Sequence, residues 1–462
     1  MKCKVLLISM FVFVLFSFVV IAQNKRPPYQ YPAELEVLQK VKEWQDLKFG
    51  LFMHWGTYSQ WGVVESWTLC PEDQSWIIRP KDKSYFQYVK EYENLITTFN
   101  PLKFDPDKWS HAAKEAGMKY VVFTTKHHDG FNMFDTQQSE YKITGKSCPF
   151  SSNPRADVTK KIFNAFRKDN FMIGAYYSIT DWHHNDFWWN YFPPVDRNIN
   201  YSSAKYPEKW ERYNNFIDKQ LEELVSGYGK LDLLWFDLIG ISKEREVDWP
   251  RFAKLVRSHQ PGIMMVARGS NNQYENYRTP EQEVPQEALD YPWETCMTMG
   301  DQWSYKPNDK YKSAHQLIQL LVRIVSKGGN FLLNIGPGPD GDLDPVAYER
   351  LNEIGNWMKI NSEAIYGTKP VKPYQEAKIA FTKKGNSVYA IYLPDEGEKT
   401  MPVKVLISSV QPIIGSKIYL LGYMKPLIWK KTEKGTIINI PSDLQRKPLC
   451  QNAWTFKIQV VL

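Results

Sequence analysis

The stretch LDLLWFD, residues 231–237, decides the expected fold because it is an apolar run that closes with an aspartate. In a β-strand, alternate side chains face the same side, so Trp235 and Asp237 share one face and Leu234 and Phe236 share the other. Strands buried on both faces are typical of a parallel sheet covered by helices. The stretch therefore predicts a buried strand whose last residue, Asp237, faces the interior. An aspartate that caps the next helix is the alternative.

The same unit of an apolar strand followed by a helical pattern recurs along the chain. Strands are expected at 49–56, 120–130, 171–182, 231–237, 262–269, 291–299 and 330–338. Such alternation predicts an α/β fold, and seven or eight units suit a TIM-like (β/α)8 barrel. A doubly wound sheet is the rival fold, but no glycine-rich phosphate loop follows the first strand.

After Pro370 the helical periodicity disappears, and short β-like runs separated by turn residues take its place. This change of pattern predicts a C-terminal β-sandwich. The expected division of the chain is a signal peptide at 1–22, a catalytic barrel at 23–368 and a β-sandwich at 369–462.

The N-terminus has the pattern of a secretory signal. Lys2 and Lys4 precede an apolar run, and Ala22 offers a small residue for cleavage. A membrane anchor is the alternative, although the run is somewhat short for one. We expect export to the periplasm or outside the cell, or to the lysosome if the source is eukaryotic, without stable membrane insertion after cleavage.

The composition excludes several classes of protein. The formal net charge is +7, and the basic residues are scattered among acids, so no nucleic-acid-binding stripe is expected. The cysteines after the signal, at positions 70, 148, 296 and 450, form no CxxC pair; one disulfide is possible. Seventeen Trp and 27 Tyr supply flat apolar faces that suit sugar rings as well as core packing. Oligomers are possible.

Polar and aromatic residues gather where the expected strands end. They are His54, His127, His128, Asp129, Tyr177, Asp237, Arg268 and Glu294. Barrel enzymes keep their chemistry at this rim, so the sequence predicts a polar, aromatic cup that fits a sugar.

Glycoside hydrolysis requires two carboxyl groups on either side of the scissile bond. Asp237 is the expected nucleophile, which Arg268 would keep ionised, and Glu294 is the expected acid. No HExxH motif or GxSxG elbow occurs, so neither a metal nor another cofactor nor serine catalysis is expected.

Six motifs follow one another between about residues 48 and 367: FGLFMHWGTYS, YVVFTTKHHDGF, LLWFD, TPEQEVP, WETCMTMGDQWSY and GGNFLLNIGPGPDG. Together and in this order, they resemble the α-L-fucosidases of glycoside hydrolase family 29. The C-terminal region resembles the family in its β-sandwich character. This resemblance implies a retaining exo-hydrolase that removes terminal α-L-fucose from glycans or glycoconjugates through a covalent glycosyl-enzyme intermediate.

The resemblance also implies roles for individual residues. Asp237 would be the nucleophile and Glu294 the acid/base, with Glu281 and Glu283 as second choices for the acid. The expected fucose-binding residues are His54, Glu65, Trp67, His127, His128, Tyr177, Trp235, Arg268 and Trp303. Of these, Trp303 resembles an aromatic residue that meets the C6 methyl group.

Three other functions stay open on the sequence. They are a non-catalytic carbohydrate-binding barrel, a metal-dependent hydrolase on the same barrel, and a retaining glycosidase for a related sugar such as galactose. Linkage preference depends on rim loops whose conformation the sequence does not give.

Overall fold

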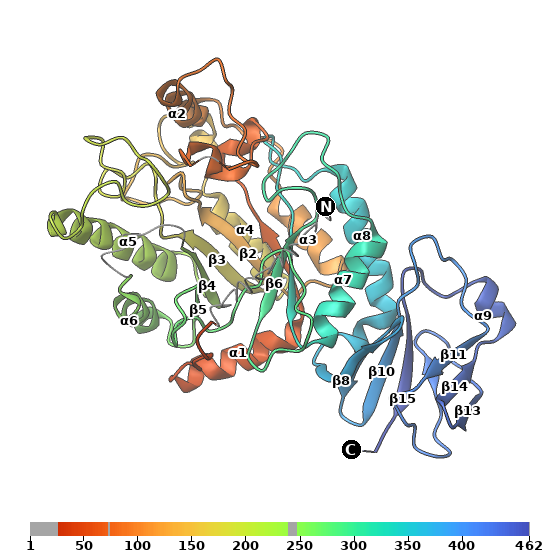
Figure 1. The fold of residues 1–462 in the computed structure, drawn as a ribbon. Coiled ribbons are helices and arrows are strands. Elements are labelled where there is room, and N and C mark those ends of the chain that lie inside the picture. The colour runs from red at the N-terminus through yellow and green to blue at the C-terminus, as the bar shows by residue number, and fades with distance from the viewer. Residues whose placement is uncertain (1–25, 73, 239–246, 462) are drawn as a thin grey trace, which may run out of the picture.

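The computed structural model describes residues 26–72, 74–238 and 247–461. The predicted signal peptide lies outside these residues. Figure 1 shows a larger part, in which helices surround a sheet, and a smaller part built mainly of strands at the C-terminal end. Within the described ranges, no helix combines the length and the apolar character needed to cross a bilayer.

The larger part is built on a curled parallel sheet in the order β5-β4-β3-β2-β1-β7-β6. Its strands are β1 (Phe49–Met53), β2 (Tyr120–Lys126), β3 (Met172–Ser178), β4 (Leu233–Asp237), β5 (Met264–Ala267), β6 (Glu294–Thr298) and β7 (Asn330–Asn334). Each falls within one of the expected stretches. The predicted barrel-like α/β fold is confirmed, although this sheet has seven strands rather than eight.

An irregular segment, residues 274–282, lies between the two edge strands β5 and β6. Asn276 donates its backbone N–H to Met265 of β5 (2.9 Å), and Gln282 donates to Cys296 of β6 (3.0 Å). Further bridges join Arg278 to Trp293 and Glu281 to Cys296. The segment takes the position of an eighth strand, and it carries Glu281 to the carboxyl-terminal rim of the sheet.

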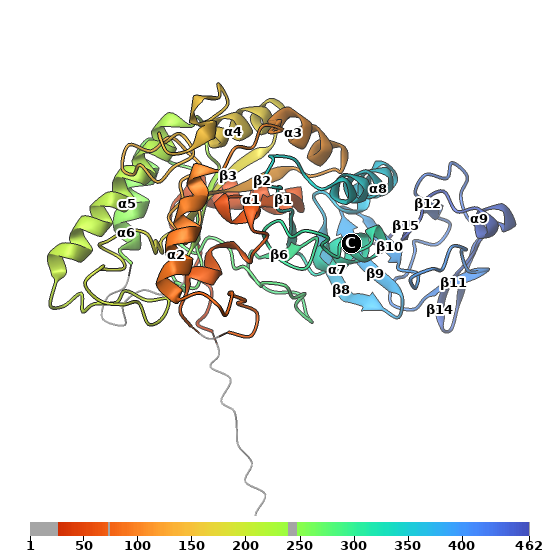
Figure 2. The same ribbon diagram turned by 90° about the horizontal axis from the view of Figure 1, so that it is seen from above.

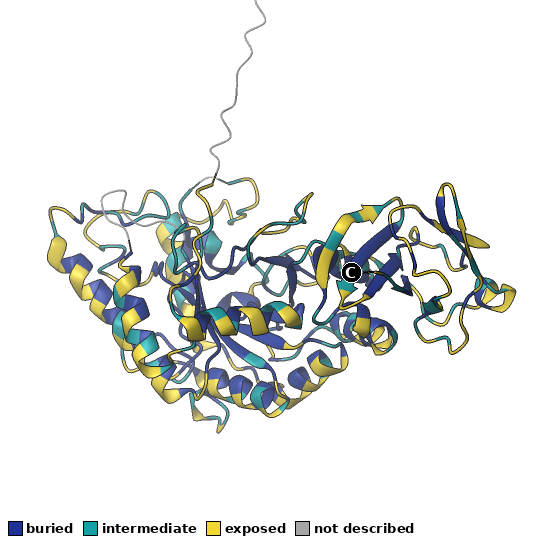
Figure 3. Ribbon diagram, turned by 90° about the horizontal axis from the view of Figure 1, so that it is seen from below, coloured by how far each residue is buried: buried dark blue, intermediate teal, exposed yellow. Residues whose placement is uncertain are grey.

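Helices cover the outside of this sheet. The α-helices are α1 (Leu35–Leu47), α2 (Tyr85–Glu93), α3 (Pro106–Glu115), α4 (Val158–Lys168), α5 (Pro207–Gly227), α6 (Trp249–His259), α7 (Ala314–Ser326) and α8 (Pro345–Asn361). Short 3-10 turns are η1 (Thr57–Gln60), η2 (Glu65–Leu69), η3 (Asn94–Thr97), η4 (Pro149–Ser152) and η5 (Ser362–Ala364). Figure 3 shows buried strands inside and helices whose exposed faces point outward, as amphipathic helices require.

Several helices begin at an aspartate whose carboxylate accepts a backbone N–H of the first turn. Asp105, Asp157, Asp248 and Asp344 do so for α3, α4, α6 and α8. Aspartate satisfies donors that the helix itself leaves unpaired, so the local sequence fixes where these helices start.

The barrel interior is filled at the end where its strands begin. Trp44 of α1 stacks on Tyr277 with ring centroids 3.9 Å apart. A Cβ atom on Gly50 would lie 2.4 Å from the Tyr120 ring, so glycine gives that ring its space. With this end closed by aromatic packing, the carboxyl-terminal ends of the strands are left to form a site.

The C-terminal part consists of two antiparallel sheets, β12-β15-β10-β9-β8 and β11-β14-β13. Its elements are β8 (Lys369–Glu376), β9 (Ile379–Lys384), β10 (Ser387–Tyr392), β11 (Lys404–Ile407), β12 (Tyr419–Leu420), β13 (Trp429–Thr432), β14 (Gly435–Asn439), α9 (Ser442–Arg446) and β15 (Trp454–Gln459). The predicted β-sandwich character is confirmed. Figure 2 shows these strands beside α7 and α8, at the far end of the molecule from α2.

Candidate active site

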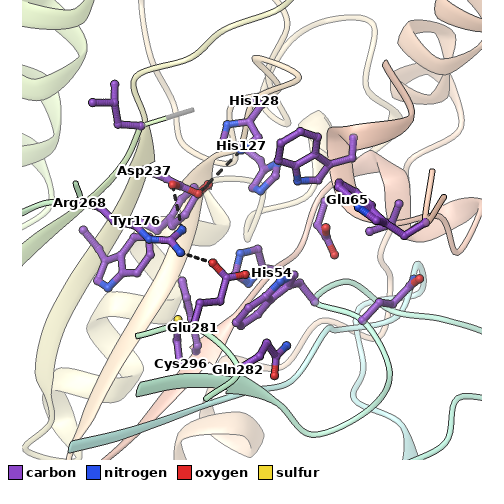
Figure 4. Close-up of a pocket in the computed structure, with 18 of the residues that line it drawn as sticks. His54, Glu65, His127, His128, Tyr176, Asp237, Arg268, Glu281, Gln282 and Cys296 are labelled. Carbon is purple, nitrogen blue, oxygen red and sulfur yellow. Dashed lines mark hydrogen bonds and ion pairs between the residues drawn. The ribbon is translucent and has the colours of Figure 1, made fainter. Parts of the chain in front are cut away.

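A cavity of about 620 Å³ opens at the carboxyl-terminal ends of the strands, where barrel enzymes carry their chemistry. Figure 4 shows side chains from strand ends and loops converging on it. Most of the predicted site residues line it, namely His54, Glu65, Trp67, His127, His128, Trp235, Asp237, Arg268 and Trp303. Position at the strand ends therefore predicted part of this pocket, and the family resemblance predicted Glu65, Trp67 and Trp303.

Asp237 ends β4, and its carboxylate accepts hydrogen bonds from two groups. Arg268 Nη1 donates to Oδ1 (3.3 Å), and the Tyr176 hydroxyl donates to Oδ2 (2.9 Å). His128 Nε2 lies 3.8 Å from Oδ2. Burial by itself raises the pKa of this carboxyl, but Arg268, His128 and Tyr176 outweigh it and the pKa lies below its usual value. Asp237 is therefore ionised at neutral pH and suited to nucleophilic attack.

Glu281 supplies a second carboxylate to the same pocket. It accepts a hydrogen bond from Arg268 Nη2, so one guanidinium contacts both Glu281 and Asp237. In Figure 4 the two carboxylates lie on either side of that guanidinium. Retaining glycosidases place their carboxyl groups roughly 5–5.5 Å apart, and sharing one guanidinium is compatible with that spacing.

Glu294, the predicted acid/base, does not line the pocket. Its side chain is buried. Tyr120 donates to its Oε2 (2.6 Å) and Trp235 Nε1 to its Oε1 (3.3 Å). The reason is its position along the strand: Glu294 begins β6 and lies one layer deeper in the barrel, whereas Cys296, two residues later, reaches the pocket.

Tyr177, which was predicted to line the sugar ring, does not line the pocket, whereas the preceding Tyr176 does. Strands β3 and β4 pair Tyr176 with Trp235, so these two side chains face the same side. Tyr176 lines the pocket and bonds Asp237. Tyr177 faces outward, where its hydroxyl donates to Gln220 Oε1 of α5 (2.8 Å).

Each pocket histidine is held by a polar neighbour that sets its tautomer. The Ser178 hydroxyl donates to the Thr180 carbonyl, so it accepts from His128 Nδ1 (2.7 Å) and leaves Nε2 as an acceptor. The Ser66 hydroxyl accepts from the Asp129 backbone N–H. Within the described residues its hydrogen has no acceptor other than His127 Nδ1 (2.6 Å), so the hydroxyl donates to Nδ1 and His127 Nε2–H becomes a donor.

His54 follows the same logic as His128. Asn334 Nδ2 donates to the Trp303 carbonyl (2.6 Å), which turns its Oδ1 toward His54 Nδ1 (2.7 Å). His54 thus presents Nε2 as an acceptor. Burial lowers the pKa of His54 and of His128 to about 4 and lowers that of His127 well below its usual value, so all three rings are neutral at pH 7. The site combines defined donors and acceptors, as recognition of sugar hydroxyls requires.

Glu65 is a buried carboxyl at a strained position. Its φ is +35°, and non-glycine residues rarely adopt positive φ. Its Oε1 accepts the Ser304 backbone N–H (2.6 Å), whereas its buried Oε2 has no hydrogen-bond partner within the described part of the protein. Burial raises its pKa to about 8, so at neutral pH Oε2 or its proton is available to a ligand.

Sequence reasoning missed the other residues of the pocket wall, which are Phe52, Val64, Trp76, Tyr176, Arg197, Leu238, Gly269, Gln282, Cys296, Asp301 and Gln302. Cys296 could have been found from alternation, because it shares a face of the expected strand with Glu294, whereas Tyr176 depends on how β3 pairs with β4. Arg197 could not have been found, because its loop is brought to the pocket by tertiary contacts: it pairs with Glu72 and lies 5.0 Å over the Trp67 ring.

The described ranges contain neither a metal-binding cluster nor a disulfide. There is no group of three or more His, Cys, Asp or Glu side chains arranged to hold a metal ion at residues 26–72, 74–238 and 247–461. Cys70, Cys148, Cys296 and Cys450 are free thiols. Burial raises the pKa of Cys296, so the thiol that lines the pocket is protonated.

Comparisons with known proteins agree with this geometry. The profile of the α-L-fucosidase family matches residues 16–363, and that of the α-L-fucosidase C-terminal domain matches residues 372–459. Human tissue α-L-fucosidase is 28% identical, covering 94% of this chain and 93% of its own.

Solved structures show the same relationship. An α-L-fucosidase isoenzyme from Paenibacillus thiaminolyticus has a TM-score of 0.75 and 27% identity, covering 92% of this chain and all of its own. The Thermotoga maritima α-fucosidase in complex with fucose has a TM-score of 0.72 and 27% identity, covering 93% and 100%. The chain therefore belongs to the α-L-fucosidase family, glycoside hydrolase family 29.

Proposed function

We propose that Asp237 is the nucleophile and Glu281 the acid/base of a retaining α-L-fucosidase reaction. The observation that carries this assignment is the Arg268 guanidinium, which contacts both carboxylates at the mouth of the barrel. Glu281 replaces Glu294 as acid/base because Glu281 lines the pocket and Glu294 does not.

The reaction proceeds in two displacements. Asp237 attacks the anomeric carbon of fucose through an oxocarbenium-like transition state, and the bond to the leaving oxygen breaks as Glu281 gives that oxygen its proton. Glu281 then takes a proton from water, which attacks the anomeric carbon and releases Asp237. Two inversions leave the anomeric configuration of the released fucose retained.

Recognition of the sugar follows from the polarity of the pocket. His127 Nε2–H donates to one fucose hydroxyl, and His54 and His128 accept from others. Trp303 offers an apolar face for the C6 methyl, which galactose replaces with a hydroxymethyl group. Glu65 Oε2 and Trp67 complete the contacts on the opposite wall. Support for these roles comes from the positions of the side chains in the pocket and from the family motifs.

The test is release of 4-nitrophenol from its α-L-fucoside by the purified protein and four variants. Asp237→Ala should lose nearly all turnover. Glu281→Gln should lower kcat about 10²–10⁴-fold, which is the range for general acid–base groups. Added azide should restore part of the rate of Glu281→Ala, because azide replaces water as the attacking nucleophile. Glu294→Gln is the matched control and should stay within about tenfold of the wild type.

The opposite order of effects, with Glu294→Gln inactive and Glu281→Gln active, would overturn the assignment. A folded wild type that releases no 4-nitrophenol, and no fucose from a fucosylated oligosaccharide, would overturn the function itself.

We further infer that the protein is exported and is cut after Ala22, on the pattern of residues 1–22. The same proposal divides the mature chain at residue 368 into a catalytic part and a β-sandwich. Mass spectrometry of the secreted protein should find Gln23 at its N-terminus, and an intact N-terminus would contradict the export signal.

A further inference from the structure

A second hollow of about 580 Å³ lies between α2 and the loop at 182–200, outside the catalytic pocket. Aromatic residues are the most numerous kind in its wall, among them Tyr85, Phe86, Trp188, Trp189, Tyr191 and Phe192. Nothing in the mechanism uses these residues. Branched aliphatic side chains, which dominate apolar protein contacts, contribute only Leu69 and Val89 to the wall.

Several of these rings face solvent although they are large and apolar. Phe86 is 66% exposed and Tyr191 73% exposed. The loop that carries Tyr191 is nevertheless held in place: Asn200 Nδ2 donates to the carbonyls of Trp189 and Phe192, and its Oδ1 accepts the Trp189 N–H. Rigid aromatic faces kept in contact with water are a ready platform for a ligand.

Polar groups lie among the rings. His183 Nδ1 and Glu93 Oε1 are 2.9 Å apart, and their side chains remain 38% and 39% exposed. The His183 ring stacks on Tyr141, which fixes its orientation. Asn190 and Asp129 also line the hollow. Flat apolar faces combined with hydrogen-bonding groups match a sugar, which has C–H faces and hydroxyl edges, better than they match a lipid chain.

The hollow adjoins the catalytic pocket, and two tryptophans lie between the two cavities. Trp67 lines the catalytic pocket and Trp182 lines the hollow, and their rings are in edge contact with centroids 5.7 Å apart. Trp182 in turn stacks on Trp188 at 5.2 Å. The wall between the two cavities is thus built from aromatic side chains, and a glycan leaving the catalytic pocket can reach the second hollow within a few sugar units.

We propose that this hollow is a second carbohydrate-binding site, which holds part of the glycan beyond the terminal fucose. The inference rests on the proposed function for its account of the first site. It makes the α2 edge and the 182–200 loop determinants of affinity for long substrates, with no part in the chemical step.

The test compares a substrate that reaches the hollow with one that does not. The double variant Phe86→Ala/Tyr191→Ala is assayed on 4-nitrophenyl α-L-fucoside and on a fucosylated pentasaccharide. Loss of two stacking faces should raise KM for the pentasaccharide by about tenfold, with kcat and the aryl-fucoside kinetics unchanged. Ile414→Ala/Met424→Ala, which removes two exposed apolar side chains from the C-terminal part, is the matched control.

Equal kinetics of the double variant and the wild type on both substrates would overturn the proposal, and so would equal losses on both. Binding is measured separately by titrating the matching tetrasaccharide without fucose into each protein. If the wild type binds the tetrasaccharide and the double variant binds it more weakly, the second site is supported even if no fucoside is hydrolysed. Failure of the proposed function is therefore recognised separately. Binding of phosphatidylcholine vesicles that the double variant loses, without any tetrasaccharide binding, would assign the hollow to lipid and overturn the proposal.

Discussion

Replacing Glu294 with glutamine should change the pH dependence of stability while sparing activity. Glu294 is completely buried and receives hydrogen bonds from Tyr120 and Trp235. Burial raises its pKa from 4.5 to about 7, so the folded protein favours the neutral carboxyl. Glutamine has nearly the same shape and stays neutral at every pH.

The size of the effect follows from the shift in pKa. Because the folded-state pKa is raised, the stability linked to this group is fully present below about pH 4.5 and is lost as the pH rises through about 7. At about 1.4 kcal/mol per pKa unit, the whole loss amounts to about 3 kcal/mol, most of it between about pH 5 and about pH 7. Glu65 and Asp129, whose pKa values are also raised, contribute in the same direction.

Urea unfolding of the wild type and of Glu294→Gln across this pH range measures the pH-dependent contribution of Glu294 to stability. The difference in unfolding free energy between the two proteins should shift by about 3 kcal/mol in favour of the variant as the pH rises. The contributions of Glu65 and Asp129 are common to both proteins and cancel. A difference that stays constant with pH would refute the reasoning, because Glu294 would then titrate alike in the folded and unfolded states.

Three further substitutions test other parts of the structure. Tyr176→Phe removes a hydrogen bond to the Asp237 carboxylate, so kcat/KM should fall roughly 10–100-fold. The acidic limb of the pH profile of kcat/KM should move to higher pH. Tyr177→Phe, the control, should leave that profile unchanged. Ser66→Ala removes the donor to His127 Nδ1, so KM should rise by up to about tenfold. The ¹⁵N NMR spectrum of the His127 ring should show mixed tautomers. An unchanged spectrum would contradict the tautomer assignment. At Gly130 the φ angle is +73°, and a new Cβ atom would lie 2.2 Å from Asp181 Oδ1. Gly130→Ala should therefore lower the unfolding free energy by about 1–3 kcal/mol. An unshifted melting temperature would refute this prediction.

The order of elements could be predicted from the sequence because it depends on local patterns. Apolar runs bounded by turn residues predicted the positions of β1 to β7, and the loss of helical periodicity predicted the antiparallel sheets after Pro370. Alternation within LLWFD placed Trp235 and Asp237 together on the inner face, where both line the pocket. The motifs predicted the family.

The depth of a residue within the barrel was decided by the tertiary structure. Glu294 and Cys296 share a face of β6, but the register against β7 places Glu294 beside Asn330 at the start of the strands. The sequence analysis predicted Tyr177 as the ring-lining residue, but the pairing of β3 with β4 aligns Tyr176 with Trp235. Registers of parallel strands depend on contacts far apart in sequence, so no local pattern fixes them.

The sequence by itself determined the sheet, its helices, the nucleophile candidate and the family, because periodicity and short motifs are local properties of a chain. Only the tertiary structure showed that residues 274–282 close the gap between β5 and β6 and bring Glu281 to the guanidinium that also holds Asp237. That pairing joins residues on separate elements, and its geometry exists only once the barrel has closed around them.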